Sequence, residues 1–286
     1  MKKYLLLLLA VALVSCQKVS LNDEEETAEE PEMKTVTFKV NGDFGTPTFT
    51  RANLSADGRD MTDLWIFDYM GDECVQTIHQ DSGDDDFGEP SLSLVYGAHH
   101  IYFVASRGVD PDLNEEDHII VWSSVRDTFW QDYEVTISRT SDTEHDVTLD
   151  RVVSKLKVTV NDRIPEGCAK LIIEPAKWYY GLDYTDGSMA WESNDEISVS
   201  IPSNYIGTVG NLSASFFTMR SDDEWTTDVT ISSSGSGNSV LGSVSIDNVP
   251  LKANRSTNYS GSLFSGRQPF LITLNEEWTD DVVLTW

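Results

Sequence analysis

The chain is poor in cysteine, in basic residues and in long apolar runs. It has three cysteines among 286 residues and no C-x-x-C pair. A disulfide framework is therefore excluded, and a zinc or redox site built on cysteines is not expected. Its 20 Lys and Arg residues stand against 48 Asp and Glu residues, which gives a formal net charge of −28. Such a chain repels phosphate backbones, so nucleic acid is not expected as a partner.

Catalytic signatures are also missing. The sequence contains no G-x-S-x-G elbow, no H-E-x-x-H helix, no P-loop and no dinucleotide fingerprint. His99 and His100 are neighbours, but adjacent residues of a strand point to opposite faces and do not chelate together. Paired carboxylates for glycoside hydrolysis stay open, because their separation in space decides that question. We expect a protein that is not an enzyme and that carries no cofactor or metal.

The acidic loop Asp81–Glu89 offers several candidate oxygen ligands for Ca²⁺. Its spacing does not follow the EF-hand pattern of alternating Asp or Asn with Gly at the sixth position. The sequence therefore favours a solvated hairpin loop over a calcium site.

The longest apolar run, Tyr4–Val14, follows Lys2 and Lys3 and stops just before Cys16. A membrane span needs about 20 apolar residues, so this shorter run is typical of an export signal. The ending Leu13-Val14-Ser15-Cys16 resembles the lipobox of bacterial lipoproteins, in which the cysteine is acylated (palmitate) and becomes the mature N-terminus. We expect a signal peptide over 1–15 and a lipid on Cys16. The alternative is an ordinary signal peptide with an incidental cysteine.

Residues 16–33 contain almost nothing to bury and are rich in Asp and Glu. They predict a flexible acidic tether between the lipid and the folded body. An acidic stretch shortly after the lipidated cysteine also resembles the surface-export signal of Bacteroidetes lipoproteins. That resemblance implies display on the outer face of the outer membrane.

From Lys34 onward, alternating apolar and polar residues predict strands. Val36, Phe38 and Val40 share one face of the first strand, and Arg151–Val160 alternates in the same way. Further candidate strands, punctuated by turn signals, are 64–69, 74–79, 91–95, 100–105, 133–138, 146–149, 170–174, 196–201, 214–219, 228–232, 239–246, 256–263, 270–273 and 282–286. This spacing predicts an all-β fold of two tandem Greek-key β-sandwich domains, 34–150 and 151–286.

The sequence also makes local predictions about one helix, two cysteines and the tryptophans. Trp122, Val125 and Phe129 stand at helical spacing and predict a short helix within Glu115–Phe129. Cys74 and Cys168 each have an apolar neighbour, which favours buried free thiols over a bridge. Of the eight tryptophans, Trp65 is expected in the core, whereas Trp178 with its tyrosine neighbours and Trp191 are candidates for exposed, sugar-stacking rings.

Five stretches in a fixed order together resemble the FimA-type (type V) fimbrial proteins of Bacteroidales, in the broad fimbrillin and FimB/Mfa2-like grouping. They are the lipobox, Thr35–Val40 followed by Phe49–Ala52, Leu64–Asp68 with Gly71 after it, the Arg151–Val160 strand, and Val249–Thr257 before Leu263-Phe264. Each stretch is weak alone, and their order carries the specificity.

The resemblance implies two transthyretin-like sandwiches, export as a lipoprotein, and assembly by strand exchange. In stalk and tip members, an Arg/Lys-specific protease cuts after the first strand, and a neighbour's strand fills the groove that is left. Here the strand removed would carry Val36, Phe38 and Val40, and the cut would fall at Arg51 or, second, at Arg59. An anchor subunit would instead keep its lipid and its first strand.

The apolar C-terminal residues Val282, Val283 and Leu284 would be a donor strand or the last strand of the second domain. The function implied is a structural fimbrial (pilus) subunit that serves cell adhesion at the outer membrane. Its partners would be other fimbrial subunits, the membrane lipid, and a ligand on a host or bacterial surface. The alternative is a surface lipoprotein that binds glycans for polysaccharide capture.

Overall fold

A computed structural model describes residues 32–42, 61–209, 212–219, 225–235, 237–265 and 271–275. These residues fall within one compact unit, Glu32–Trp286. The signal peptide, Cys16, Arg51, Arg59 and the strand expected at Val282–Leu284 lie outside the described residues. In the part of the chain that the structure describes, no helix has the length and apolar character of a membrane span.

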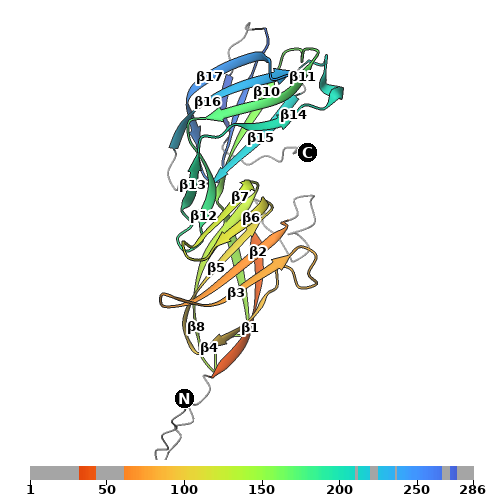
Figure 1. The fold of residues 1–286 in the computed structure, drawn as a ribbon. Helices are drawn as coiled ribbons and strands as arrows, with labels where there is room; N and C mark the ends of the chain where they lie inside the picture. The colour runs from red at the N-terminus through yellow and green to blue at the C-terminus, as the bar shows by residue number, and fades with distance from the viewer. Residues whose placement is uncertain are drawn as a thin grey trace, which may run out of the picture. The chain divides into compact units, whose positions relative to one another are not determined.

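The described residues form 19 strands and one short 3-10 turn at Ser203–Tyr205, so the all-β prediction is confirmed (Figure 1). Seven strands make the N-terminal sandwich, hydrogen-bonded in the order β3-β2-β5-β8-β9-β1-β4. Their bounds are β1 Met33–Gly42, β2 Asp63–Met70, β3 Glu73–Asp81, β4 Ser91–Val95, β5 Gly97–Ser106, β8 Thr128–Ile137 and β9 Glu144–Arg151.

The seven strands fold into two layers, because β8 and β9 pair only at Phe129↔Arg151 and Trp130↔Asp150. One layer is β4-β1-β9 and the other is β3-β2-β5-β8. The inward side chains of both layers meet in one apolar core, which includes Val36 and Phe38 from the first layer and Ile66 and Phe103 from the second.

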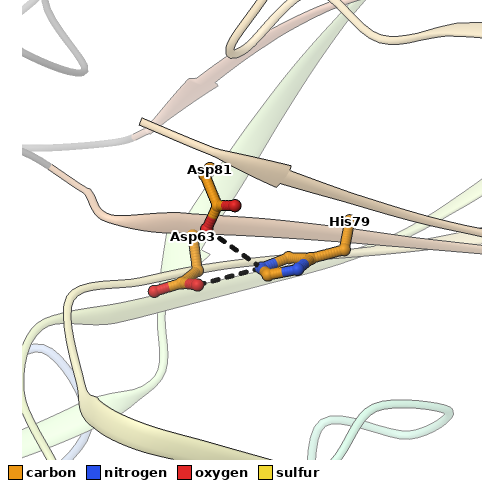
Figure 2. A group of neighbouring side chains, drawn as sticks. All are labelled: Asp63, His79 and Asp81. Atoms are coloured by element: carbon orange, nitrogen blue, oxygen red, sulfur yellow. Dashed lines mark hydrogen bonds and ion pairs between the residues drawn. The ribbon is translucent and has the colours of Figure 1, made fainter. Parts of the chain in front are cut away.

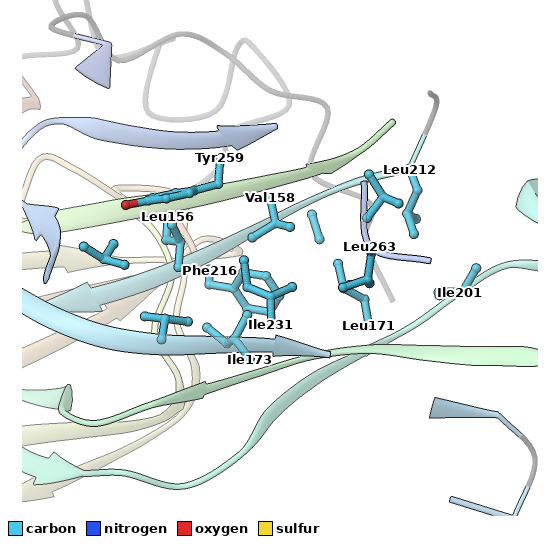
Figure 3. Packing of buried hydrophobic residues seen from close by; sticks show 14 of the residues in the cluster. Leu156, Val158, Leu171, Ile173, Ile201, Leu212, Phe216, Ile231, Tyr259 and Leu263 are labelled. Atoms are coloured by element: carbon cyan, nitrogen blue, oxygen red, sulfur yellow. The ribbon is translucent and has the colours of Figure 1, made fainter. Parts of the chain in front are cut away.

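The C-terminal sandwich has the same two-layer plan. One sheet runs β15-β10-β18-β19 and the other β14-β11-β16-β17. Figure 3 shows the inward residues of both sheets, among them Leu156, Ile173, Ile231 and Tyr259, interleaved in a single core. The bounds are β10 Val153–Val160, β11 Cys168–Pro175, β14 Ile197–Ser200, β15 Leu212–Met219, β16 Trp225–Gly235, β17 Val240–Leu251, β18 Ser256–Gly261 and β19 Leu271–Asn275.

A further sheet, which we call the shared sheet, takes two strands from each side of residue 150. Its order is β13-β12-β7-β6, and the two hairpins join through β12 and β7, for example Gly181↔Val121. It is built from β6 Val109–Asn114, β7 Ile119–Ser124, β12 Trp178–Asp183 and β13 Met189–Ser193. The division of the chain into 34–150 and 151–286 and the Greek-key connection stay predictions.

The shared sheet explains why β2 is buried on both faces rather than on one. Leu64 and Ile66 point into the core of the N-terminal sandwich. Trp65 and Phe67 point the other way, into a second apolar cluster with Trp122 of β7 and with Leu182 of β12. A strand covered on both sides loses the polar half of its alternation, which is what the sequence Leu64-Trp65-Ile66-Phe67 shows.

The helix expected within Glu115–Phe129 is wrong. Residues Ile119–Ser124 are strand β7, which pairs with β6 and β12, and β8 begins at Thr128. The β-branched run Ile119-Ile120-Val121 favours a strand. Ile120 and Trp122 alternate into the second apolar cluster, so tertiary pairing overrides the helical spacing.

Candidate functional site

The resemblance found in the sequence implies that β1 is the strand that is either removed or retained, and the structure places β1 between β4 and β9 in its sheet. It pairs antiparallel with β4 over Met33–Thr37 and parallel with β9 over Thr37–Gly42. The β4 ladder covers the first half of one edge, which backbone hydrogen bonds from Phe38 to Pro90 and from Val40 to Gly88 continue, and the β9 ladder covers the second half of the other edge. Removing β1 would therefore expose hydrogen-bonding edges on both β4 and β9, which could template another strand.

The inward face of β1 is fully buried. Val36 and Phe38 are 0 % exposed and Val40 is 2 % exposed. The Phe38 ring lies 5.5 Å from that of Phe103, and it stacks on the ring of His145 at 5.7 Å. Burying a large apolar side chain contributes about 1.5–3 kcal/mol, so these three together contribute roughly 5 kcal/mol or more.

The outward face of β1 is polar and is held by a surface ion pair. Lys39 Nζ lies 2.7 Å from Glu144 Oε2 on β9. The hydrogen bond and the charge attraction between these two side chains raise the pKa of Lys39 and lower the pKa of Glu144. On the β4 side, the hydroxyls of Thr37 and Ser91 lie 2.8 Å apart. Most of the energy that retains β1 therefore comes from its inward face.

A buried arginine lies where the chain passes from β9 to β10. Arg151 donates from Nε to Asp127 Oδ1 at 2.7 Å and from Nη1 to Asn254 Oδ1 at 2.9 Å. Its guanidinium stands 4.8 Å from the centre of the Phe129 ring. Asp127 precedes β8 and Asn254 lies between β17 and β18, so one side chain ties the two sandwiches together. Sequence reasoning missed this role, for which the sequence carries no signal.

His99 and His100 face opposite sides of β5, in agreement with the prediction. His99 is buried, with Nδ1 2.7 Å from Asp68 Oδ1 and Nε2 2.8 Å from the Val95 carbonyl oxygen. Burial raises the pKa of Asp68, against the lowering effect of His99. Because both ring nitrogens of His99 have partners, this pair fixes the β4–β5 corner. His100 is half-exposed and lies beside Asp132 and Glu134.

Figure 2 shows a second group of possible metal ligands, Asp63, His79 and Asp81. His79 Nε2 is 2.9 Å from Asp63 Oδ1 and 4.0 Å from Asp81 Oδ1. The imidazole stacks on the Trp65 ring at 4.8 Å. The 2.9 Å contact is an ordinary hydrogen bond, which satisfies this nitrogen without an ion.

The acidic loop that follows is closed by its own hydrogen bonds. Asp81 donates its backbone N–H to Asp84 Oδ2. Gln80 donates from Nε2 to the Asp86 carbonyl and accepts from the Gly88 N–H. Asp81 is the only residue of Asp81–Glu89 that joins a possible ligand group among the described residues. The loop is thus a turn closed by hydrogen bonds, and the expectation that it binds no calcium stays a prediction.

The aromatic and cysteine predictions are right for some residues and wrong for others. Trp65 is 4 % exposed, as expected, and Trp191 on β13 is 64 % exposed with φ +55°. Trp178 is a candidate for exposure in the sequence, and this candidate is wrong: its side chain is 0 % exposed and its Nε1 donates to the Phe217 carbonyl. Both described cysteines are free thiols, with Cys168 buried. Cys74 is exposed, contrary to expectation, because it lies on edge strand β3.

Comparison with solved structures shows the fold. A proposed polysaccharide-binding protein of Bacteroides thetaiotaomicron aligns with TM-score 0.54 and 11 % identity, over 84 % of this chain and 95 % of that one. A proposed adhesin of Bacteroides ovatus aligns with TM-score 0.53 and 12 % identity, over 86 % and 95 %. A fimbrial assembly protein of Parabacteroides distasonis aligns with TM-score 0.50 and 12 % identity, over 86 % and 100 %.

A search of curated protein sequences finds no match to the chain. A family model does match, over residues 109–280, which is more than half of the sequence. The matched region runs from the first strand of the shared sheet through the whole described part of the C-terminal sandwich. The chain belongs to the family of fimbrillin-A-associated anchor proteins Mfa1 and Mfa2.

Proposed function

We propose that this protein is the anchoring subunit of a surface fimbria, held in the outer membrane by lipid on Cys16 and active in cell adhesion without enzymatic activity. The observation that carries the proposal is the match, over residues 109–280, to a family of fimbrial anchor proteins. The packing of β1 agrees with this role, because a strand that pairs with β4 and β9 and buries its inward face stays in place while the chain is uncut.

The order of Cys16, β1 and the two arginines along the chain determines whether a lipid on Cys16 stays covalently attached to the folded body. Cys16 precedes β1, and Arg51 and Arg59 lie between β1 and β2. While the segment from Gly42 to Asp63 is intact, the lipid, β1 and the rest of the protein are one covalent unit. A cut at Arg51 or Arg59 would leave only the β1 ladders and core contacts to connect the lipid to the body. An anchor therefore needs this segment uncut, whereas a polymerising subunit needs it cut.

Two sets of variants in fimbriated cells test this function. Cys16→Ala should move the protein from the outer-membrane fraction into the soluble fraction, and fibres should be shed. The double variant Arg51→Ala/Arg59→Ala should anchor fibres as well as the wild type does. Arg163→Ala, an arginine in the second half of the chain, is the matched control for the loss of a basic residue.

Other outcomes would contradict the anchor. One such outcome is a surface-isolated protein that begins just after Arg51 or Arg59 and runs as denaturant-resistant ladders that the double variant abolishes. The chain is then a stalk or tip subunit that assembles by strand exchange, with Val36, Phe38 and Val40 on the removed strand and Val282, Val283 and Leu284 on the donor. If Cys16→Ala leaves the protein in the membrane, the lipid anchor itself is wrong.

Trp191 favours a second function, glycan binding at the cell surface. Its large ring is exposed in a left-handed backbone conformation, and the absence of a side chain at Gly181 leaves room for it. Exposed aromatic faces can stack on sugar rings. Affinity electrophoresis on polysaccharide gels should show retardation that Trp191→Ala removes and that Val240→Ala, another exposed apolar residue, does not. Equal mobility of all three proteins would exclude this function.

A further inference from the structure

His100, Asp132 and Glu134 form a group on the N-terminal sandwich that the anchor function does not use. His100 and Glu134 are directly opposite each other on β5 and β8, and Asp132 is opposite Tyr102. Alternate residues of a strand share a face, so Asp132 and Glu134 lie on the same face of the sheet. Directly paired residues bring their Cβ atoms within about 5.5 Å. The register therefore places one imidazole and two carboxylates together.

The distances within this group suit a shared ion better than direct hydrogen bonds. His100 Nδ1 lies 3.5 Å from Asp132 Oδ1 and 3.9 Å from Glu134 Oε1. Hydrogen bonds between N–H and oxygen are typically about 2.7–3.2 Å long. Two ligands that each lie about 2.0–2.1 Å from a tetrahedral zinc ion are roughly 3.4 Å apart. The separation from Asp132 is close to the second value, and the separation from Glu134 is somewhat longer than it.

A second observation, solvent shielding, concerns the same atoms. His100 Nδ1 and Asp132 Oδ1 are shielded from solvent, and neither has a hydrogen-bond partner in the part of the chain that the structure describes. Buried polar atoms without partners are uncommon and costly. In the other group of possible ligands, His79 Nε2 already has its hydrogen bond to Asp63. The two groups look alike in composition, but only one leaves ligand atoms unsatisfied.

We propose that His100, Asp132 and Glu134 bind a divalent transition-metal ion of the zinc type, which clamps β5 to β8. One imidazole nitrogen and two carboxylate oxygens are a donor set that suits zinc, and three protein ligands leave a fourth position for water. Glu134 is 76 % exposed, so an ion can enter from solvent. The strongly acidic chain attracts cations in general, but the imidazole selects against Ca²⁺ and Mg²⁺. This site is separate from the anchor function and does not depend on it.

Calorimetric titration of the EDTA-treated full chain with ZnCl₂ tests the proposal. One zinc ion per chain should bind, and a tenfold excess of Mg²⁺ should not prevent it. His100→Gln and Asp132→Asn should each weaken binding at least tenfold. His79→Gln, the matched control in the other group, should bind zinc as the wild type does. Co²⁺ at the site should give the visible absorption bands of a tetrahedral ion, which Glu134→Gln should diminish.

The outcomes are distinguishable. Near-UV circular dichroism of each variant without metal checks its fold, and the exposed Glu134 offers a variant that does not disturb the core. No zinc binding by the wild type would overturn the proposal and leave the group as an ion pair only. Equal zinc affinity in the wild type and His100→Gln would overturn it too. Loss of binding in His79→Gln alone would move the site to Asp63, His79 and Asp81.

Discussion

The N-terminal and C-terminal sandwiches place their first strands in equivalent positions. β1 pairs antiparallel with β4 and parallel with β9, and β10 pairs antiparallel with β15 and parallel with β18. The opposite layers also correspond, as β3-β2-β5-β8 in one sandwich and β14-β11-β16-β17 in the other. The same pattern of apolar residues at alternate positions builds a central strand in both.

The two strands differ in how the chain holds them. β10 follows β9 after the single residue Val152, and residues 161–167 connect it to β11. β1 is connected to β2 through the longer segment 43–62, which contains Arg51 and Arg59. The two strands therefore occupy equivalent positions in their sheets, but β10 is joined to described strands at both ends and β1 at one end only. Of the two strands, only β1 could be separated from all other described strands by one cut, so under the proposed function its retention or release would distinguish an anchor from a polymerising subunit.

The largest expected effects come from breaking the two equivalent cores. Phe38→Ala on β1 should lower the free energy of unfolding by about 3–5 kcal/mol, and Leu156→Ala on β10 by about 2–5 kcal/mol, because each leaves a cavity at a fully buried site. Urea denaturation followed by tryptophan fluorescence measures both. Lys157→Ala, next to Leu156 and less buried, is a control. Equal stability of Phe38→Ala and the wild type would show that β1 is not packed as described.

A slightly smaller effect tests whether the sandwiches unfold together. Arg151→Met should cost about 3 kcal/mol, because Asp127 stays buried without its cation. Since Arg151 also bonds Asn254, scanning calorimetry should resolve one wild-type transition into two. The double variant Arg151→Met/Asp127→Leu should recover much of the stability, because it removes the unpaired charge. A single unchanged transition in Arg151→Met would mean that other contacts, such as the shared sheet, couple the two sandwiches.

The smallest expected effect is on the pH dependence of stability, and it should arise from the N-terminal sandwich and not from the C-terminal one. Burial raises the pKa of Asp68, so the folded state holds this proton more tightly than the unfolded state. Its contribution to stability is fully present below the ordinary value of 3.8 and is lost as pH rises through the raised pKa. Asp68→Asn should flatten the pH dependence of urea midpoints in that window. Glu174→Gln, an exposed site on β11, is the matched control, and an equal change in both variants would contradict the assignment.

Most of both sandwiches could be predicted from the sequence. Val36, Phe38 and Val40 alternate with polar residues and are buried, as the period of two requires. The strand expected at 91–95 is β4 with the same bounds, and that expected at 214–219 lies within β15. Such strands have one apolar and one polar face, so local pattern alone identifies them.

The four strands that the sequence analysis missed are those of the shared sheet. β6 contains Pro111 and is mostly polar, β12 contains Gly181, and β13 carries the exposed Trp191. β7 reads as part of a helix. None of these strands alternates cleanly, because each is stabilised by a partner that lies far away along the chain or by an apolar layer beneath it. Local propensity says little about such strands.

The sequence by itself determined the class of fold, the inward face of β1 and the order of Cys16, β1, Arg51 and β2 along the chain, because these depend only on neighbouring residues. The tertiary structure alone decided which layer covers the second face of β2, that Arg151 joins the two sandwiches, and that His100 meets Asp132 and Glu134. Those features depend on strand register and on contacts between distant segments. The alternation of apolar and polar residues specifies which face of the strand a side chain lies on, but only the partner strand specifies which residues it contacts.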